Sequence, residues 1–499
     1  MKVIIIGSGI GGLASACLLA KKGYEVQVLE KNEMLGGRLS IFEEKGYRFD
    51  MGPSWYLMPD VFEHFYDLLG EKVDDHLHLV KLSPSYRIFF KDTDKVVDCY
   101  SDLKRDLPTV EALEKGASEK LKKYLALSEY QYNIALQNFM YKNYDSWLDF
   151  INWRTVIQGT KLSVFQPMHK YVSKFFHSEW MQKIMQYHLV FLGSSPYNTP
   201  ALYNIMSHID FNMGVFYPEK GIYEIINSLK NIGEKYGVQY KINAPVKEIV
   251  VKDKRAVGVT LASGAFEAAD IVISNADIHH TETRLLAPQW RSFKANYWEK
   301  KVLAPSGFIL YLGIDGKIDN LVHHNLIFSK DWRENFDQIF ARPQLPTDPS
   351  FYVCAPSKTD STVAPEGKEN LFVLVPIAAG LDLKAEDIET YKNQILDTMA
   401  TSMKIPDLKQ RIEFERIFTV NDFQERYNSY RGSALGLAHT FMQTAIFRPN
   451  NVSKKVANLY YVGANTNPGI GMPICMISAE LVLKRILGDK SSTPLRSLS

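Results

Sequence analysis

At 499 residues the chain is long enough for about two or three domains, each with its own core. Its 58 basic and 56 acidic residues nearly cancel, which argues against the clustered positive charge typical of nucleic-acid binding. The four cysteines are scattered and form no metal-ligand motif, so the sequence predicts a reducing compartment and no bound metal.

The first elements predict a dinucleotide-binding unit. An apolar strand at residues 3–6 leads into a glycine loop at residues 7–12, and a helix is expected at residues 13–22. The next strand, residues 25–29, ends at Glu30, close to the spacing at which an acid hydrogen-bonds the adenosine ribose of NAD or FAD. Strand, loop, helix, strand and acid in this order favour a bound dinucleotide over an ordinary turn.

Each glycine of this loop has a predicted role. Gly7 permits the tight turn, Gly9 leaves room for the phosphates, and Gly12 allows helix and strand to pack closely. The helix N-terminus then points at the pyrophosphate. Gly11 of the loop and Lys31 beside the acid are also predicted to bind the cofactor.

A secretory signal is the alternative for this end, because Lys2 precedes an uncharged stretch at residues 3–20. The glycines make a poor apolar helix, so we predict a cytoplasmic protein. No other uncharged apolar run is long enough to predict a membrane span.

A second glycine loop follows Glu30. Gly36, Gly37 and Arg38 match a loop that flavoproteins of the amine-oxidase type place beside the FAD pyrophosphate, where Arg38 neutralises charge. An arginine in a solvated turn is the alternative.

The next elements are a strand and turn at residues 47–55, a helix at 60–69, a hairpin at 85–98 and a long helical region at 110–213. Aromatic residues are concentrated in that last region, from about residue 124 onward. They can lie at a bilayer interface or pack a helical core, and composition alone does not decide between the two.

The middle of the chain returns to nucleotide-domain patterns. Strands at residues 239–242, 246–251 and 256–261 are predicted to form a three-stranded excursion that encloses the adenine. Residues 269–277 read as a buried strand with a polar exit. Residues 290–430 alternate strands and helices without a motif.

The C-terminal block predicts the second half of the cofactor site. A buried strand at residues 458–465 is followed by a glycine-rich turn and a helix at residues 474–487, so a second helix N-terminus is left bare. Such a terminus stabilises negative charge on a reduced flavin. The predicted contacts are Gly463, Ala464, Asn465, Gly471, Met472 and Pro473.

These segments together resemble the bacterial phytoene desaturases, the FAD-dependent carotenoid desaturase group, over about residues 1–488. The resemblance is carried by residues 7–12, 36–38, 49–53, 355–367, 430–434, 447–451 and 458–473. Two departures, Glu219-Lys220-Gly221 and Asn465-Thr466-Asn467-Pro468, lie near the expected flavin and substrate ends and leave the particular carotenoid open.

The resemblance implies an α/β fold: a Rossmann-like FAD-binding domain of the glutathione reductase/amine oxidase type, with a substrate domain and a membrane-associating helical region. The implied segments are 1–70, 217–289 and 431–488 for FAD, 71–109 and 290–430 for substrate, 110–216 for the helical region and 489–499 for a flexible tail. It adds Gly52, Pro53, Ser54 and Val246 as FAD contacts, and Met51, Trp55 and Tyr56 as substrate contacts. Asp149 matches an acid position of the family and is a candidate proton acceptor, although a solvated helix carboxylate is the simpler interpretation.

The implied reaction is oxidation of an acyclic carotenoid, with hydride passing to FAD and a proton leaving the neighbouring carbon. Quinone or dioxygen would reoxidise the flavin, and a lipid-dissolved substrate implies peripheral association with the cytoplasmic membrane. The alternatives are a diapophytoene or 3,4-desaturase, a terminal-methyl oxidase, a carotene isomerase, an amine oxidase and a non-catalytic carotenoid-binding flavoprotein.

Overall fold

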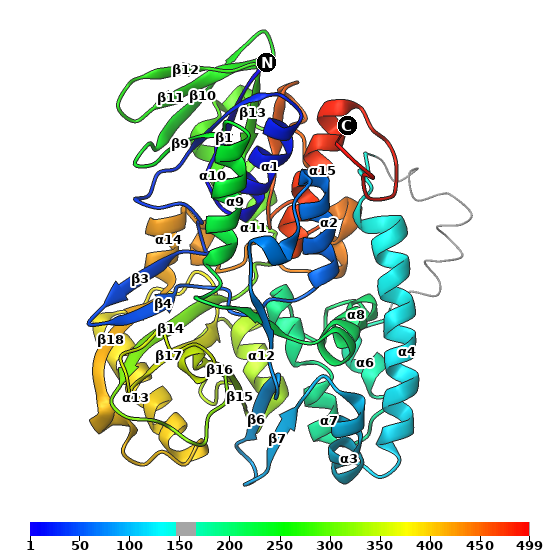
Figure 1. The fold of residues 1–499 in the computed structure, drawn as a ribbon, viewed down its shortest axis with the longest axis vertical. Coiled ribbons are helices and arrows are strands. Elements are labelled where there is room, and N and C mark those ends of the chain that lie inside the picture. Colours follow the sequence, from blue (N-terminus) through cyan, green and yellow to red (C-terminus); the bar gives the residue numbers. More distant parts are fainter. Residues whose placement is uncertain (146–165, 499) are drawn as a thin grey trace.

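A five-stranded parallel sheet carries the N-terminal glycine loop. The computed structural model describes residues 1–145 and 166–498 of the chain (Figure 1). The strand order is β19-β13-β1-β2-β9, with β1 (Lys2–Ile6), β2 (Glu25–Leu29), β9 (Gln239–Lys241), β13 (Ile271–Ser274) and β19 (Leu459–Tyr461). Because all pairs are parallel, the loops that follow β1 and β19 leave the sheet at the same edge.

Helices from distant parts of the chain cover this sheet. The first helix, α1 (Ile10–Lys21), packs against α15 (Met472–Leu487) and α9 (Glu224–Lys235), and α2 (Pro59–Leu69) lies beside α15 (Figure 1). Helix α15 begins two residues before its predicted start because Pro473 is well suited to the first turn of a helix.

The three-stranded excursion exists, but one of its three predicted strands belongs to a different sheet. Residues 239–241 form β9, which pairs in parallel with β2 at the edge of the main sheet. The antiparallel excursion consists of β10 (Val246–Lys252), β11 (Arg255–Leu261) and β12 (Phe266–Ala268). Because β12 is short and mostly exposed, its sequence has little strand pattern to detect.

A second, seven-stranded sheet lies below the first in Figure 1. Its order is β18-β14-β17-β16-β15-β6-β7, antiparallel except where β15 pairs with β6. The predicted hairpin supplies two of its strands. The bounds are β6 (Tyr86–Phe90), β7 (Val96–Cys99), β14 (Ser306–Ile314), β15 (His324–Phe328), β16 (Phe351–Cys354), β17 (Glu369–Ile377) and β18 (Ile412–Phe418).

Short elements connect these layers. Two strand pairs are β3 (Ile41–Glu44) with β4 (Tyr47–Asp50), and β5 (Leu79–Lys81) with β8 (Phe216–Pro218). The remaining helices of this part are α10 (Ile278–His280), α11 (Ala295–Glu299), α12 (Trp332–Phe340), α13 (Ala385–Ser402) and α14 (Val420–Tyr427).

The helical region lies beside the seven-stranded sheet and reaches α15, where Lys484 Nζ donates to the Tyr141 carbonyl at 2.9 Å (Figure 1). Its helices are α3 (Leu103–Leu113), α4 (Ala117–Ala135), α6 (Met168–Val172), α7 (Glu179–Ile184) and α8 (Ile205–His208), with π-helical turns at Leu136–Met140 and Ile209–Met213. Helix α3 starts seven residues before the predicted region, because the Asp102 side chain accepts the Lys104 N–H and caps it.

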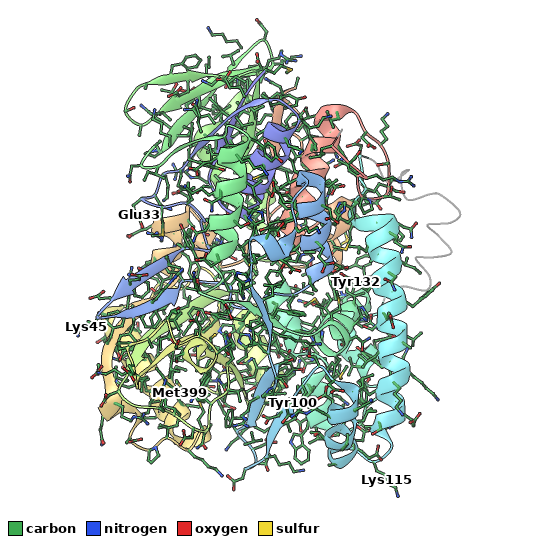
Figure 2. All side chains as sticks on the ribbon, viewed as in Figure 1. Glu33, Lys45, Tyr100, Lys115, Tyr132 and Met399 are labelled. Carbon is green, nitrogen blue, oxygen red and sulfur yellow. The ribbon has the colours of Figure 1, made fainter. Side chains whose placement is uncertain are left out.

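Most aromatic side chains described in this region are buried. Tyr124, Tyr171 and Phe176 pack together within one core cluster, and Tyr132 lies on the inner side of α4 (Figure 2). Core packing therefore explains their concentration, whereas membrane contact by this region stays a prediction. Within residues 1–145 and 166–498, no helix combines the length and apolarity needed to cross a bilayer.

The described part of the C-terminal segment, residues 489–498, contains no helix or strand and contacts α15, and the flexibility expected for residues 489–499 stays a prediction. Leu498 is buried, and the Leu495 N–H donates to Glu480 Oε1 at 2.6 Å. The strands of the parallel sheet fall within residues 1–70, 217–289 and 431–488; the division into domains itself stays a prediction.

Candidate active site

The N-terminal glycine loop forms a close backbone junction between β1 and α1. Gly7 has φ of 91°, which favours glycine. A Cβ on Gly12 would lie 2.2 Å from the Gly7 carbonyl oxygen, so Gly12 is required for the packing that the sequence predicts. No side chain caps the N-terminus of α1, so its first amides are left for a ligand.

Glu30 braces this loop from the end of β2. Its Oε2 accepts the Ser8 N–H at 2.9 Å and the Ser8 hydroxyl at 2.7 Å, and its Oε1 accepts the Asn32 N–H at 2.8 Å. The carboxylate is buried at the wall of the cavity described below. Its first role is therefore to fix the glycine loop, and a carboxylate has lone pairs left to accept a hydrogen bond from a ligand in the cavity.

The second glycine loop lies directly on the first. The Gly36 N–H donates to the Ser8 carbonyl at 3.0 Å, and a Cβ on Gly37 would lie 3.2 Å from Gly9 Cα. Arg38 donates to Ser429 Oγ at 2.8 Å, while its buried Nε has no hydrogen-bond partner among the described residues. An unpaired guanidinium nitrogen beside two bare loops suits an anionic ligand.

The C-terminal loop completes the same region. Gly463 has φ of 102° and Gly471 has φ of 129°, and no side chain caps α15. The Asn465 amide donates to Asp277 Oδ2 at 3.1 Å, and its oxygen accepts the Leu437 N–H at 2.9 Å. Two helix N-termini from opposite ends of the chain thus face one space.

Two supporting residues escaped the sequence analysis. Asn275, just after β13, fills the gap between the two loops: Cβ atoms on Gly11 and Gly463 would lie 2.9 and 2.8 Å from its Oδ1. Arg448 is buried, and it donates to the carbonyls of Ala464 at 2.6 Å and Thr466 at 3.1 Å. Burial lowers the pKa of Arg448 to about 10. The polar ending of the predicted strand at 269–277 was the one available signal for Asn275.

One cavity of about 900 Å³ joins these loops to an apolar chamber. Such a volume lies in the range of ligand sites in proteins. The chamber is walled mainly by aliphatic and aromatic side chains from the helical region and the seven-stranded sheet. They include Phe139, Met140, Val190, Phe191, Leu202, Ile205, Met206, Leu326, Phe328, Phe372 and Leu374.

Most of the predicted site residues line this cavity. They are Gly7, Gly9, Gly11, Glu30, Lys31, Gly36, Gly37, Arg38, Met51, Gly52, Pro53, Ser54, Trp55, Val246, Gly463, Ala464, Asn465, Gly471, Met472 and Pro473. Gly12 lies behind the loop. Asp149 lies outside the described residues, so its predicted role stays a prediction.

Tyr56 is not brought to the cavity. Its ring stacks on Phe62 at 4.2 Å in the core of the parallel sheet, while its neighbour Trp55 faces the chamber. Successive side chains of an extended segment point to opposite sides, so two adjacent aromatics do not share one site. The prediction of Tyr56 as a substrate contact is therefore wrong.

A polar cluster interrupts the apolar wall near α15. The Ile470 N–H donates to His439 Nε2 at 3.1 Å, so the neutral ring carries its proton on Nδ1 and donates it to the Tyr203 hydroxyl. Tyr203 also lies 3.3 Å from Thr444 Oγ1. Burial holds the pKa of His439 well below its usual range, which keeps the ring neutral.

A second cluster brings His323, His324 and Cys354 together in the core, where their ligand-type atoms lie within 4.8 Å of one another. Sequence spacing did not reveal this group, because the pairing of β15 with β16 creates it. His324 Nδ1 lies 2.6 Å from the Tyr352 hydroxyl and His323 Nδ1 2.8 Å from the Thr359 hydroxyl. These hydroxyls already engage one nitrogen of each ring, and the absence of bound metal stays a prediction.

The geometry suits FAD. The two bare helix N-termini can take the pyrophosphate and the pyrimidine edge of the flavin, and Gly9 and Gly11 line the cavity beside the first of them without a side chain. Val246, at the start of β10, lines the cavity with Ala244 and Pro245, and its contact with FAD stays a prediction.

Comparison with known proteins agrees with this geometry. The family of flavin containing amine oxidoreductases matches residues 10–487. A carotenoid 3,4-desaturase of Haloarcula japonica is 45% identical over 98% of both chains, and a zeta-carotene-forming phytoene desaturase of Myxococcus xanthus is 36% identical over 97% of this chain and 94% of the relative.

Solved structures share the fold at low sequence identity. An oxidoreductase from Methanosarcina mazei superposes with a TM-score of 0.65 at 16% identity, over 97% of this chain and all of that one. Wild-type putrescine oxidase with putrescine bound gives 0.64 at 14% identity, over 98% and 99% of the two chains. The chain belongs to the flavin-containing amine oxidoreductase family and, within it, to the FAD-dependent carotenoid desaturases. It is an FAD-dependent oxidoreductase, as predicted.

Proposed function

We propose that the protein desaturates an acyclic carotenoid. One allylic carbon loses a hydride, the neighbouring carbon loses a proton, and the electron pair of the second C–H bond forms the new double bond. FAD, when bound, accepts the hydride. The observation that carries the proposal is the continuity of the FAD cradle with a chamber walled by apolar side chains.

The residues of the chamber have two tasks in this reaction. Apolar walls exclude water and hold the polyene against the cofactor, which supplies orientation in place of acid-base groups. Trp55 lies at the junction of chamber and cradle, 5.2 Å from Phe191 and 6.4 Å from Tyr187 between ring centroids. Aromatic faces at this position stabilise the positive charge that develops on the allylic system.

Amine oxidation is disfavoured by the charges of the cavity. Among the described lining residues the carboxylates are Glu30 and Asp277. Glu30 is engaged by the glycine loop, and Asp277 caps α10 through the His279 N–H and accepts from Asn465. Neither lies in the apolar chamber, so a substrate ammonium would find no carboxylate partner there.

The test is anaerobic mixing of the yellow protein with carotene in liposomes or detergent. Flavin bleaching together with a longer polyene spectrum supports desaturation. Bleaching by an alkyl amine but by no carotene, or absence of both, would overturn it.

Phytoene is the proposed substrate, and 3,4-desaturation of a later carotenoid is the second candidate. The 45% identical relative favours the second, and the 36% identical relative favours the first. Chromatography of products from phytoene and from an acyclic carotene with a complete central polyene but a saturated 3,4 bond separates them, because each candidate predicts turnover of one and not the other.

We also propose that quinone or dioxygen reoxidises the flavin and that the protein works peripherally on the cytoplasmic membrane. A carotene dissolved in lipid supports the location. Reoxidation rates in air and with a lipid quinone under argon would identify the acceptor.

A further inference from the structure

Four large apolar side chains are exposed on one short surface of the protein. The exposed fractions of Val302, Phe441, Met442 and Phe447 are 38%, 39%, 59% and 43%. The Gln443 side chain joins them, accepting the Val302 N–H at 2.9 Å and donating to its carbonyl at 2.8 Å. We call these four residues the apolar tip. Exposed apolar groups gathered in this way mark an interaction surface.

The segment that carries the apolar tip is also a wall of the active-site cavity. Thr444 and Ala445, between Met442 and Phe447, line the cavity. Phe139 and Met140, at the end of the α4 region, line it too and are themselves partly exposed. Only the segment around Thr444 and Ala445 therefore separates a ligand at the tip from the cavity.

Lysines accompany the tip. Lys300 and Lys301 precede Val302 in the chain, and neither has an ion-pair partner among the described residues. The Lys301 ammonium lies 4.4 Å from the Tyr297 ring centroid, and the residue is half-buried. One acid, Glu299, lies in the same stretch. Apolar residues with basic neighbours and an interfacial tyrosine have the chemistry of a surface that enters an anionic lipid layer.

We propose that the apolar tip inserts into the headgroup region of an anionic bilayer, and that the cavity takes its apolar substrate from the lipid at this point. The second half of the statement rests on the proposed function; the first half does not. The tip lies outside residues 110–216, the region for which the family resemblance implies membrane association.

The first test is vesicle binding by the holoenzyme. Phe441→Ser/Met442→Ser/Phe447→Ser should bind phosphatidylcholine/phosphatidylglycerol vesicles about tenfold more weakly than wild type. Phe266→Ser is the matched control, because Phe266 on β12 is 53% exposed in a different part of the fold. Lys300→Gln/Lys301→Gln should weaken binding to anionic vesicles and leave binding to neutral ones unchanged.

A local probe separates insertion from general adhesion. All four native cysteines are buried, so a polarity-sensitive dye on Met442→Cys reports from the tip alone. Its emission should shift to the blue with vesicles, whereas dye on Phe266→Cys should not. Equal binding of the triple variant and wild type, or an unshifted dye, would overturn the proposal.

Two further readouts keep the outcomes distinct. Sedimentation without vesicles compares the oligomeric state of wild type with that of the triple variant. A dimeric wild type and a monomeric variant would show that the tip is a self-association surface, and that result would also overturn membrane insertion. Flavin bleaching by carotene in detergent should be the same in the triple variant and wild type. If carotene bleaches the flavin of neither protein while wild type still binds vesicles through the tip, the proposed function is refuted and the membrane contact is still supported.

Discussion

Gly9 and Asn275 lie against one another across the cofactor cradle. A Cβ on Gly9 would lie 2.8 Å from Asn275 Nδ2, and beyond the adjoining residues of the chain the atoms within 4 Å of that position belong to Asn275. The backbone of Gly9 is extended, with φ of −63°, so alanine is free of backbone strain there. A side chain at position 9 would therefore clash with Asn275 within the protein. When FAD is bound, the side chain is expected to clash with the cofactor as well.

Gly9→Ala should weaken FAD binding at least about tenfold, or ~1.4 kcal/mol. Adding Asn275→Ala removes the clash within the protein, so the double variant should regain the melting temperature of the Asn275→Ala single variant in apo form. FAD affinity should stay low, because the new methyl group still occupies the path of the phosphates. Flavin fluorescence titration and apo melting curves provide the measurements; full recovery of FAD affinity would contradict a phosphate contact at Gly9.

A buried carboxylate, Asp210, predicts how stability depends on pH. Its Oδ2 accepts the Tyr86 and Tyr187 hydroxyls at 2.7 and 3.1 Å, and burial raises its pKa to about 7. An unfolded aspartate titrates near pH 3.9, so between about pH 4 and pH 7 the folded state binds more protons and stability falls as pH rises. The slope from this group reaches at most about 1.4 kcal/mol per pH unit and ends above pH 7.

Asp210→Asn should flatten that slope, because asparagine keeps an acceptor for the tyrosines and does not ionise. Urea unfolding from pH 4 to pH 8 compares the two proteins. The variant should gain stability relative to wild type as pH rises, and Asp50, whose pKa burial raises to about 6, contributes equally to both. Parallel curves would show that Asp210 does not titrate in this range.

The parts of the site that the sequence predicted are those whose signal is local. Glycine spacing and the strand before it locate both loops, because a positive φ or a close backbone approach, as at Gly12, restricts the residue type directly. Asn275 contacts Gly7 and Tyr203 contacts His439 across more than 200 residues, so apart from the polar end of the strand at 269–277 the neighbouring sequence gives no signal for these roles. The prediction for Tyr56 was wrong because the sequence shows two adjacent aromatic residues but not which of them faces the cavity.

His439 connects the chamber to the flavin end of the site, and two variants separate its contacts. His439→Leu leaves the Ile470 N–H without its acceptor, a loss of about 1–3 kcal/mol. Since Ile470 precedes the N-terminus of α15, FAD affinity should fall along with stability. Tyr203→Phe keeps the Ile470 contact, so it should lower the melting temperature and leave FAD affinity within about twofold. Equal losses of FAD in both variants, measured by titration, would contradict this division.

Met206 tests the apolar chamber directly. Its side chain is buried in the cavity wall, where a carboxylate would face a hydrocarbon substrate without a partner. Met206→Asp should reduce carotene turnover by about a hundredfold or more, because an unpaired buried charge costs several kcal/mol. Met206→Leu, which conserves volume, should keep most activity. FAD content should be unchanged in both variants, since Met206 belongs to the chamber and not to the cradle. Product formation at saturating FAD is the measurement, and wild-type turnover by Met206→Asp would show that the polyene lies elsewhere.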